Sequence, residues 1–174
     1  MKYRHFYLTY VLIMLVQMIV CNFIYIPPFI TLTTLPILIM MLPIETGTIK
    51  AMVIAFVTAL ALDLLSDGLL GLNCLALVPV ALLRRPLISL VFGREVFARN
   101  ENIPDFSRSA FSFSVGSILC LSLFLAIYIL ADGAGTRPFW FNLTRFVASL
   151  VADYVVAIIV SIAFNSTANS SRWN

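Results

Sequence analysis

Long apolar runs alternate with short polar connections along most of the chain. Six runs are long enough, or nearly long enough, to cross a bilayer: residues 6–26, 29–44, 49–65, 69–83, 110–130 and 141–164. A helix of about 20 apolar residues spans a hydrocarbon core of roughly 30 Å. The pattern therefore predicts an all-α polytopic membrane protein, a bundle of six transmembrane helices that forms one domain over residues 1–174.

The second and fourth runs are the shortest, and each contains a proline, Pro36 and Pro79. A proline inside a helix removes one backbone hydrogen bond and clashes with the preceding turn. We therefore expect kinks or incomplete spans in these two runs.

The basic residues predict the orientation of the bundle. With six spans, most of them fall on one side: Lys2, Arg4, Lys50, Arg84, Arg85, Arg94, Arg99, Arg108 and Arg172. Only Arg137 and Arg145 fall on or near the other side. Because cytoplasmic connections carry an excess of lysine and arginine, both termini are expected in the cytoplasm.

The composition agrees with a membrane protein and argues against several kinds of binding site. The chain is 61% hydrophobic and 11% charged, whereas soluble domains carry about 25% charged residues. Its formal charge of +3 is explained by topology, so no nucleic-acid binding is expected. The three cysteines lack C-x-x-C spacing and His5 is the single histidine, so we expect no metal, no cofactor and no disulfide framework.

The longest connection, residues 84–108, is predicted to be a cytoplasmic loop. It contains Arg84, Arg85, Arg94 and Arg99, which could lie near anionic lipid headgroups or bind a cytoplasmic partner. A solvated loop that merely follows the positive-inside rule is the simpler alternative.

A ridge of small residues leads to an acid in the third run. Ala51, Ala55, Ala59 and Asp63 follow one another at intervals of four, and such rows allow helix backbones to approach closely in lipid. A turn with further small or polar residues comes next: Ser66, Gly68, Gly71 and Asn73. The ridge and turn could either bind a partner helix or pack the protein's own bundle.

The last run contains two intramembrane charges, Arg145 and Asp153. A carboxylate near the middle of a bilayer costs about 2.5–3.5 kcal/mol on insertion scales, so Asp153 is expected to face protein or water and to have a partner. Helical side chains lean toward the N-terminus, which directs Arg145 away from Asp153. We therefore expect Arg145 to pair with Asp63, which lies at a similar depth.

Patterns typical of catalysis are missing from the sequence. No serine or cysteine has a matching histidine and acid, and no glycine-rich phosphate loop is present, so an enzyme is not expected. A transport role for Asp63 or Asp153 would require more polar residues in the spans. Structural packing is the simplest role for both acids.

Residues 59–77, ALALDLLSDGLLGLNCLAL, resemble the signature of the rod-shape-determining MreD family. That signature is an apolar helix ending in D-L-[IL]-S-G, a small turn with a second glycine after a leucine, and an apolar helix that begins with a polar residue. Asp63 to Ser66 match directly, and Leu70-Gly71 matches the second half. Asp67 departs from the pattern, because the first glycine comes one place later.

The resemblance implies a non-enzymatic subunit of the bacterial cell-elongation machinery in the inner membrane. Members of the family associate with the single-span protein MreC, and through it with the MreB filament and the glycan polymerase and transpeptidase that extend the lateral wall. The family fold is also similar to the six-helix substrate-binding subunits of energy-coupling-factor vitamin transporters. Vitamin binding is therefore the alternative function.

Overall fold

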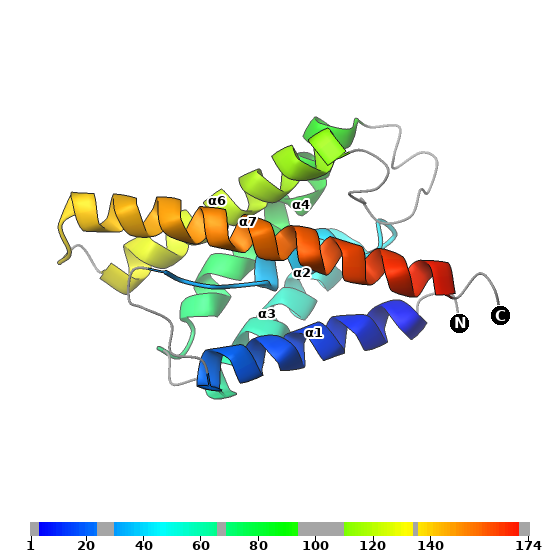
Figure 1. The fold of residues 1–174 in the computed structure, drawn as a ribbon, viewed down its shortest axis with the longest axis horizontal. Helices are drawn as coiled ribbons and strands as arrows, with labels where there is room; N and C mark the ends of the chain where they lie inside the picture. Colours follow the sequence, from blue (N-terminus) through cyan, green and yellow to red (C-terminus); the bar gives the residue numbers. More distant parts are fainter. Residues whose placement is uncertain (1–3, 24–29, 66–68, 94–109, 134–135, 171–174) are drawn as a thin grey trace.

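The computed structural model describes residues 4–23, 30–65, 69–93, 110–133 and 136–170. Within these residues the chain is helical apart from short connections and one extended segment (Figure 1). The helices are α1 (Arg4–Phe23), α2 (Leu35–Met40), α3 (Thr48–Leu65), α4 (Leu72–Phe92), α6 (Ala110–Gly133) and α7 (Phe139–Ser170).

Five of these helices, α1, α3, α4, α6 and α7, are long and apolar enough to cross a membrane. The all-helical, multi-pass class expected from hydropathy is therefore confirmed, but the count of six spanning helices is not. The fourth expected run is longer than predicted, because α4 continues through Pro79 and Pro86 to Phe92. Residues 84–92 are thus helix and not loop, while Arg94 and Arg99 lie outside the described residues.

The second expected run does not form a spanning helix. Residues 30–34 have no regular secondary structure, and α2, which follows, has only six residues, all of them buried. Pro36 lies in the first turn of α2, where its missing N–H costs little. The expectation of an incomplete span at this run is confirmed.

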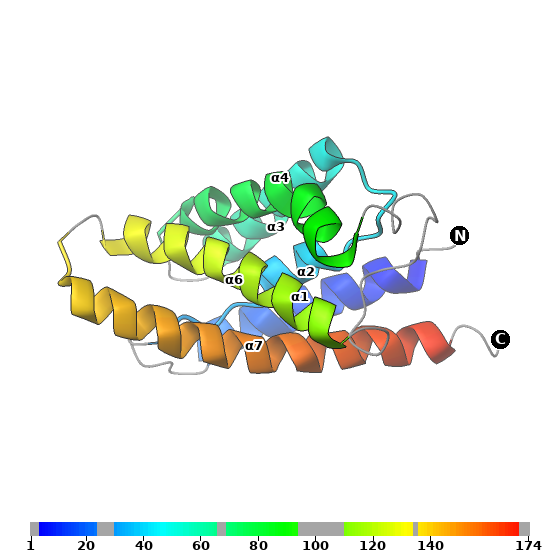
Figure 2. The same cartoon turned by 90° about the horizontal axis from the view of Figure 1, so that it is seen from above.

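Residues 30–47, which we call the crossing segment, nevertheless pass from one end of the bundle to the other. They lead from the end where α1 finishes to the end where α3 begins, and α2 lies among the longer helices (Figures 1 and 2). Non-helical backbone at membrane depth is tolerated only where protein or water surrounds it. The first helix begins and the last helix ends at the same end of the molecule (Figure 1), as an even number of crossings requires.

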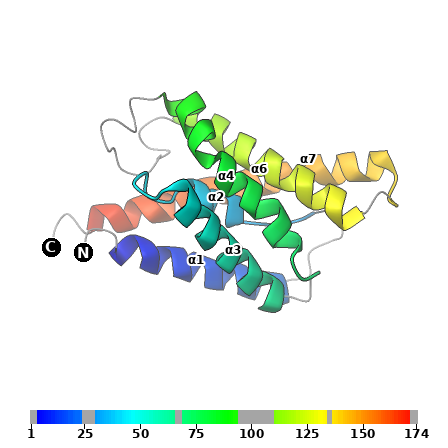
Figure 3. The ribbon, with the colours of Figure 1, turned by 180° about the vertical axis from the view of Figure 1, so that it is seen from behind.

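The core of the bundle forms around α2. This short helix packs against α3, α4 and α6, while α7 packs against α6 and α1 (Figures 2 and 3). Gly116 on α6 allows the close approach, because a Cβ atom built there would lie 2.9 Å from the terminal methyl carbon of Met40. Large apolar side chains on the outer faces of the five long helices remain exposed, as lipid contact requires.

Candidate functional site

The extended part of the crossing segment lacks helical hydrogen bonds. Side chains of α7 accept hydrogen bonds from two of its backbone N–H groups instead. The N–H of Thr31 donates to Ser149 Oγ at 2.8 Å, and the N–H of Thr33 donates to Asp153 Oδ1 at 2.8 Å. Ser149 and Asp153 are fully buried. Their four-residue spacing places both on one face of α7, so the polar face of this helix stabilises an irregular backbone in the bundle interior.

A buried glutamine on α1 also binds this backbone, as a donor to a carbonyl group. Gln17 Nε2 donates to the carbonyl oxygen of Leu32 at 2.9 Å and also contacts Cys21 Sγ at 3.3 Å. A carbonyl group without a partner in an apolar interior costs roughly 1–3 kcal/mol. Gln17 was not among the residues expected to matter, although the single glutamine of a mostly apolar run is a signal that could have identified it.

At the other end of α2, Arg84 binds the carbonyl groups that the short helix leaves free. Its Nε lies 3.4 Å from Met40 O, and one terminal nitrogen contacts Leu42 O and, at 3.3 Å, Pro43 O. Arg84 is only 2% exposed. The expectation that it lies in a cytoplasmic loop near lipid or a partner is therefore wrong, whereas Arg85 next to it is exposed.

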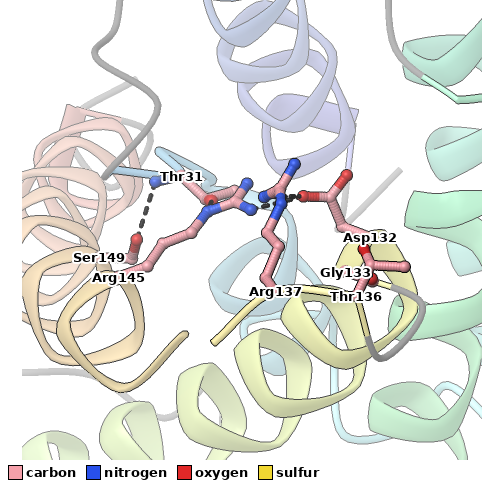
Figure 4. A network of polar contacts seen from close by, with 7 residues as sticks. All are labelled: Thr31, Asp132, Gly133, Thr136, Arg137, Arg145 and Ser149. Atoms are coloured by element: carbon pink, nitrogen blue, oxygen red, sulfur yellow. Dashed lines mark hydrogen bonds and ion pairs between the residues drawn. The ribbon is translucent and has the colours of Figure 1, made fainter. Parts of the chain in front are cut away.

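The end of the bundle at which α7 begins carries a network of charges (Figure 4). Asp132 Oδ2 lies 2.9 Å from Arg137 and 2.5 Å from Arg145, whose Nε also donates to Thr31 Oγ1 at 3.1 Å. The pairing of Arg145 with Asp63 expected from the sequence is therefore wrong. Asp132 was missed, although it is the first carboxylate that precedes Arg145 in the sequence and the connection between α6 and α7 brings the two together.

Asp63 instead holds the start of α4. Its Oδ2 accepts the Gly71 N–H at 2.9 Å, and its Oδ1 accepts a hydrogen bond from Asn73 Nδ2 at 2.7 Å. Gly71 has a φ of +88°, a conformation that side chains disfavour. Two of the expected turn residues, Gly71 and Asn73, thus come together with Asp63 as a cap for α4, while Ser66 and Gly68 lie outside the described residues.

The ridge that leads to Asp63 packs inside the protein's own bundle. Ala51, Ala55 and Ala59 are all buried, and Asp63 is 2% exposed. The sequence left two roles open for the ridge. Its burial supports internal packing, because buried side chains present no surface to another chain.

Removing the carboxylate of Asp63 is expected to destabilise the hairpin formed by α3 and α4. Asp63→Ala leaves the Gly71 N–H and the Asn73 amide without an acceptor and should cost about 2 kcal/mol, whereas Asp63→Asn keeps one acceptor oxygen and should cost about 1 kcal/mol. Thermal unfolding in detergent measures both. Thr144→Ala is the control, since this exposed hydroxyl bonds only to its own helix; equal midpoints for all three variants would contradict the cap.

The described residues contain no group of three histidine, cysteine or acidic side chains that could hold a metal ion. The described residues do contain a set of buried polar side chains that bind the backbone of the crossing segment. These features define a multi-pass helical membrane protein with an irregular segment inside its bundle. No protein-family model, curated protein or solved structure matches the chain.

Proposed function

We propose that this protein is a non-enzymatic scaffold subunit of the bacterial cell-elongation machinery in the inner membrane. In this proposal it binds the transmembrane helix of MreC and thereby supports lateral peptidoglycan synthesis by the MreB-associated glycan polymerase and transpeptidase. The observation that carries the proposal is the hydrogen bond from the Gly71 N–H to Asp63. It joins two positions of the MreD-like segment and gives a physical reason for their occurrence together.

Because the small-residue ridge is buried, a partner helix would dock elsewhere on α3. Val53, Phe56 and Val57 lie on one exposed face of this helix, at spacings of three and four residues. Helices associate in lipid through close packing of such faces. We therefore assign this face to the partner; it lies on the same helix as the first residues of the MreD-like segment.

Co-purification from detergent tests the assignment. The chain and an affinity-tagged MreC from the same organism are expressed together, and the chain retained by the tag is measured. Val57→Trp should reduce retention by about tenfold, because a large side chain at a helix contact costs on the order of 1–3 kcal/mol. Val155→Trp is the matched control, since Val57 is 58% exposed on α3 and Val155 is 53% exposed on α7.

Retention of the chain at background level in the wild type would contradict the scaffold proposal itself. Equal retention of both variants and the wild type would contradict only the docking face. Loss of rod shape in cells depleted of this protein, restored by the wild type and by Val155→Trp but not by Val57→Trp, is the expected cellular result.

The alternative, a substrate-binding subunit of an energy-coupling-factor transporter, is favoured by one feature. Broken or extended backbone surrounded by polar side chains in the bundle interior is typical of transport sites, and residues 30–34 have this character. The two functions differ in a simple measurement. Depletion that reduces vitamin uptake while leaving cell shape unchanged would support transport and exclude the scaffold.

A further inference from the structure

Asp153 has one carboxyl oxygen that nothing in the described structure satisfies. The residue lies near the middle of the apolar span of α7 and is fully buried. Its Oδ1 accepts the Thr33 N–H, but its buried Oδ2 has no hydrogen-bond partner among the described residues. A bare carboxylate in such a place costs several kcal/mol, so this carboxyl group requires either a positive charge beside it or a proton.

The arginines of the surrounding bundle do not supply that charge. Arg145 is two helical turns away and pairs with Asp132, while Arg84 binds the carbonyl groups at the far end of α2. The titratable side chains within the described spans packed against α7, and the tyrosine next to Asp153, carry no positive charge: Tyr7, Tyr10 and Cys21 on α1, Cys120, Tyr128 and Asp132 on α6, and Tyr154. Arg4 and His5 precede the apolar span of α1. Residues 30–34 contain no titratable side chain.

We propose that Asp153 is a proton-binding site, with the proton carried on Oδ2 in the folded protein. A protonated carboxyl group is both a donor and an acceptor, so Oδ1 can keep the Thr33 N–H while Oδ2 donates. Thr34 Oγ1, in the residue after that contact, is also buried without a partner and is the candidate acceptor. A proton fits better than a sodium ion, which needs several oxygen ligands and finds Oδ1 already occupied by a donor.

This site links proton binding to the crossing segment. The same carboxyl group accepts the backbone N–H of Thr33, so release of the proton would leave a negative charge beside the non-helical residues 30–34. The inference is independent of the proposed function, because it concerns the interior of the bundle and not the face of α3.

The pH dependence of thermal unfolding tests the site. A proton that the folded protein binds and the unfolded chain releases makes the folded state less stable as pH rises. Between about pH 6 and about pH 9, the wild-type midpoint should therefore fall by up to ~3–5 °C per pH unit relative to Asp153→Asn. The carboxamide of Asp153→Asn keeps an acceptor for Thr33 and a donor in place of the acid, so this variant should fold and show a flat profile.

Asp63→Asn is the matched control, because the same substitution is made at a carboxylate whose two oxygens both accept hydrogen bonds. It should keep the wild-type slope. Equal slopes in the wild type and Asp153→Asn would overturn the proposal. A rise in the wild-type midpoint with added NaCl, seen neither in Asp153→Asn nor with the same concentration of KCl, would also overturn it, because it would assign the site to sodium.

Carbodiimide labelling of the wild-type protein provides a second readout that needs no variant. Dicyclohexylcarbodiimide enters apolar regions and reacts with protonated carboxyl groups: the acid proton passes to a carbodiimide nitrogen, and the carboxyl oxygen bonds to the central carbon. Peptide mapping by mass spectrometry should find the adduct on Asp153, decreasing as pH rises, and not on Asp63. Labelling of Asp63 with Asp153 unlabelled at acidic pH would contradict the site.

Discussion

Replacing Arg84 with methionine is expected to lower the free energy of unfolding by about 3 kcal/mol, or the midpoint by roughly 6–12 °C. Methionine can fill much of the space of the side chain but cannot donate to Met40, Leu42 or Pro43. The carbonyl groups at the end of α2 would then be buried without partners. Because α2 has only six residues, it cannot satisfy them by extending its own helix.

Thermal unfolding of the purified protein in detergent measures this effect. Arg85→Met is the matched control, since the neighbouring side chain is exposed and its removal should change stability by no more than about 0.5 kcal/mol. Arg84→Lys should fall between the two, because one ammonium group keeps the charge but lacks the planar arrangement of donors. Equal midpoints for Arg84→Met and Arg85→Met would show that Arg84 does not stabilise the crossing segment.

Replacing Ala55 with leucine is expected to disrupt packing around α3 and to cost about 1–3 kcal/mol or more. Ala55 is fully buried in the middle of the ridge that ends at Asp63. In lipid, helices stay together mainly through close backbone approach, so three added carbon atoms would push neighbouring elements apart. Lower yield of monodisperse protein and a lower unfolding midpoint are the expected measurements.

Ala61→Leu is the control for this prediction, because it makes the same change on the same helix at a partly exposed position. It should leave the midpoint near the wild-type value. If both substitutions were tolerated equally and only Ala55→Leu reduced co-purification with MreC, the ridge would be a partner surface and its assignment to internal packing would be wrong.

Much of the architecture was predictable from the sequence because it depends on solvent preference. The third run was expected over residues 49–65 and α3 is Thr48–Leu65; the fifth was expected over 110–130 and α6 is Ala110–Gly133. Insertion into lipid selects apolar stretches of sufficient length, and that property is a sum over neighbouring residues. The ridge of alanines was also visible, since its spacing is local.

Contacts between residues that flank one turn could be predicted from the sequence, but one of them was predicted incorrectly. Asp63 and Gly71 flank one turn, and the structure joins them. Asp132 and Arg145 flank another, yet Arg145 was paired with Asp63 because depth in the membrane was considered without proximity along the chain. Depth restricts which charges can meet, but many positions share one depth.

The chain by itself thus determined that this is a helical membrane protein and where most of its spans lie. Only the tertiary structure decided that residues 30–34 are not helical and that Asp153 and Arg84 bind the backbone of the crossing segment. The hydropathy of an apolar run is the same whether the run forms a helix or an extended segment. What decides between them is whether polar groups more than forty residues away can supply the missing hydrogen bonds, and such contacts exist only after the bundle has formed.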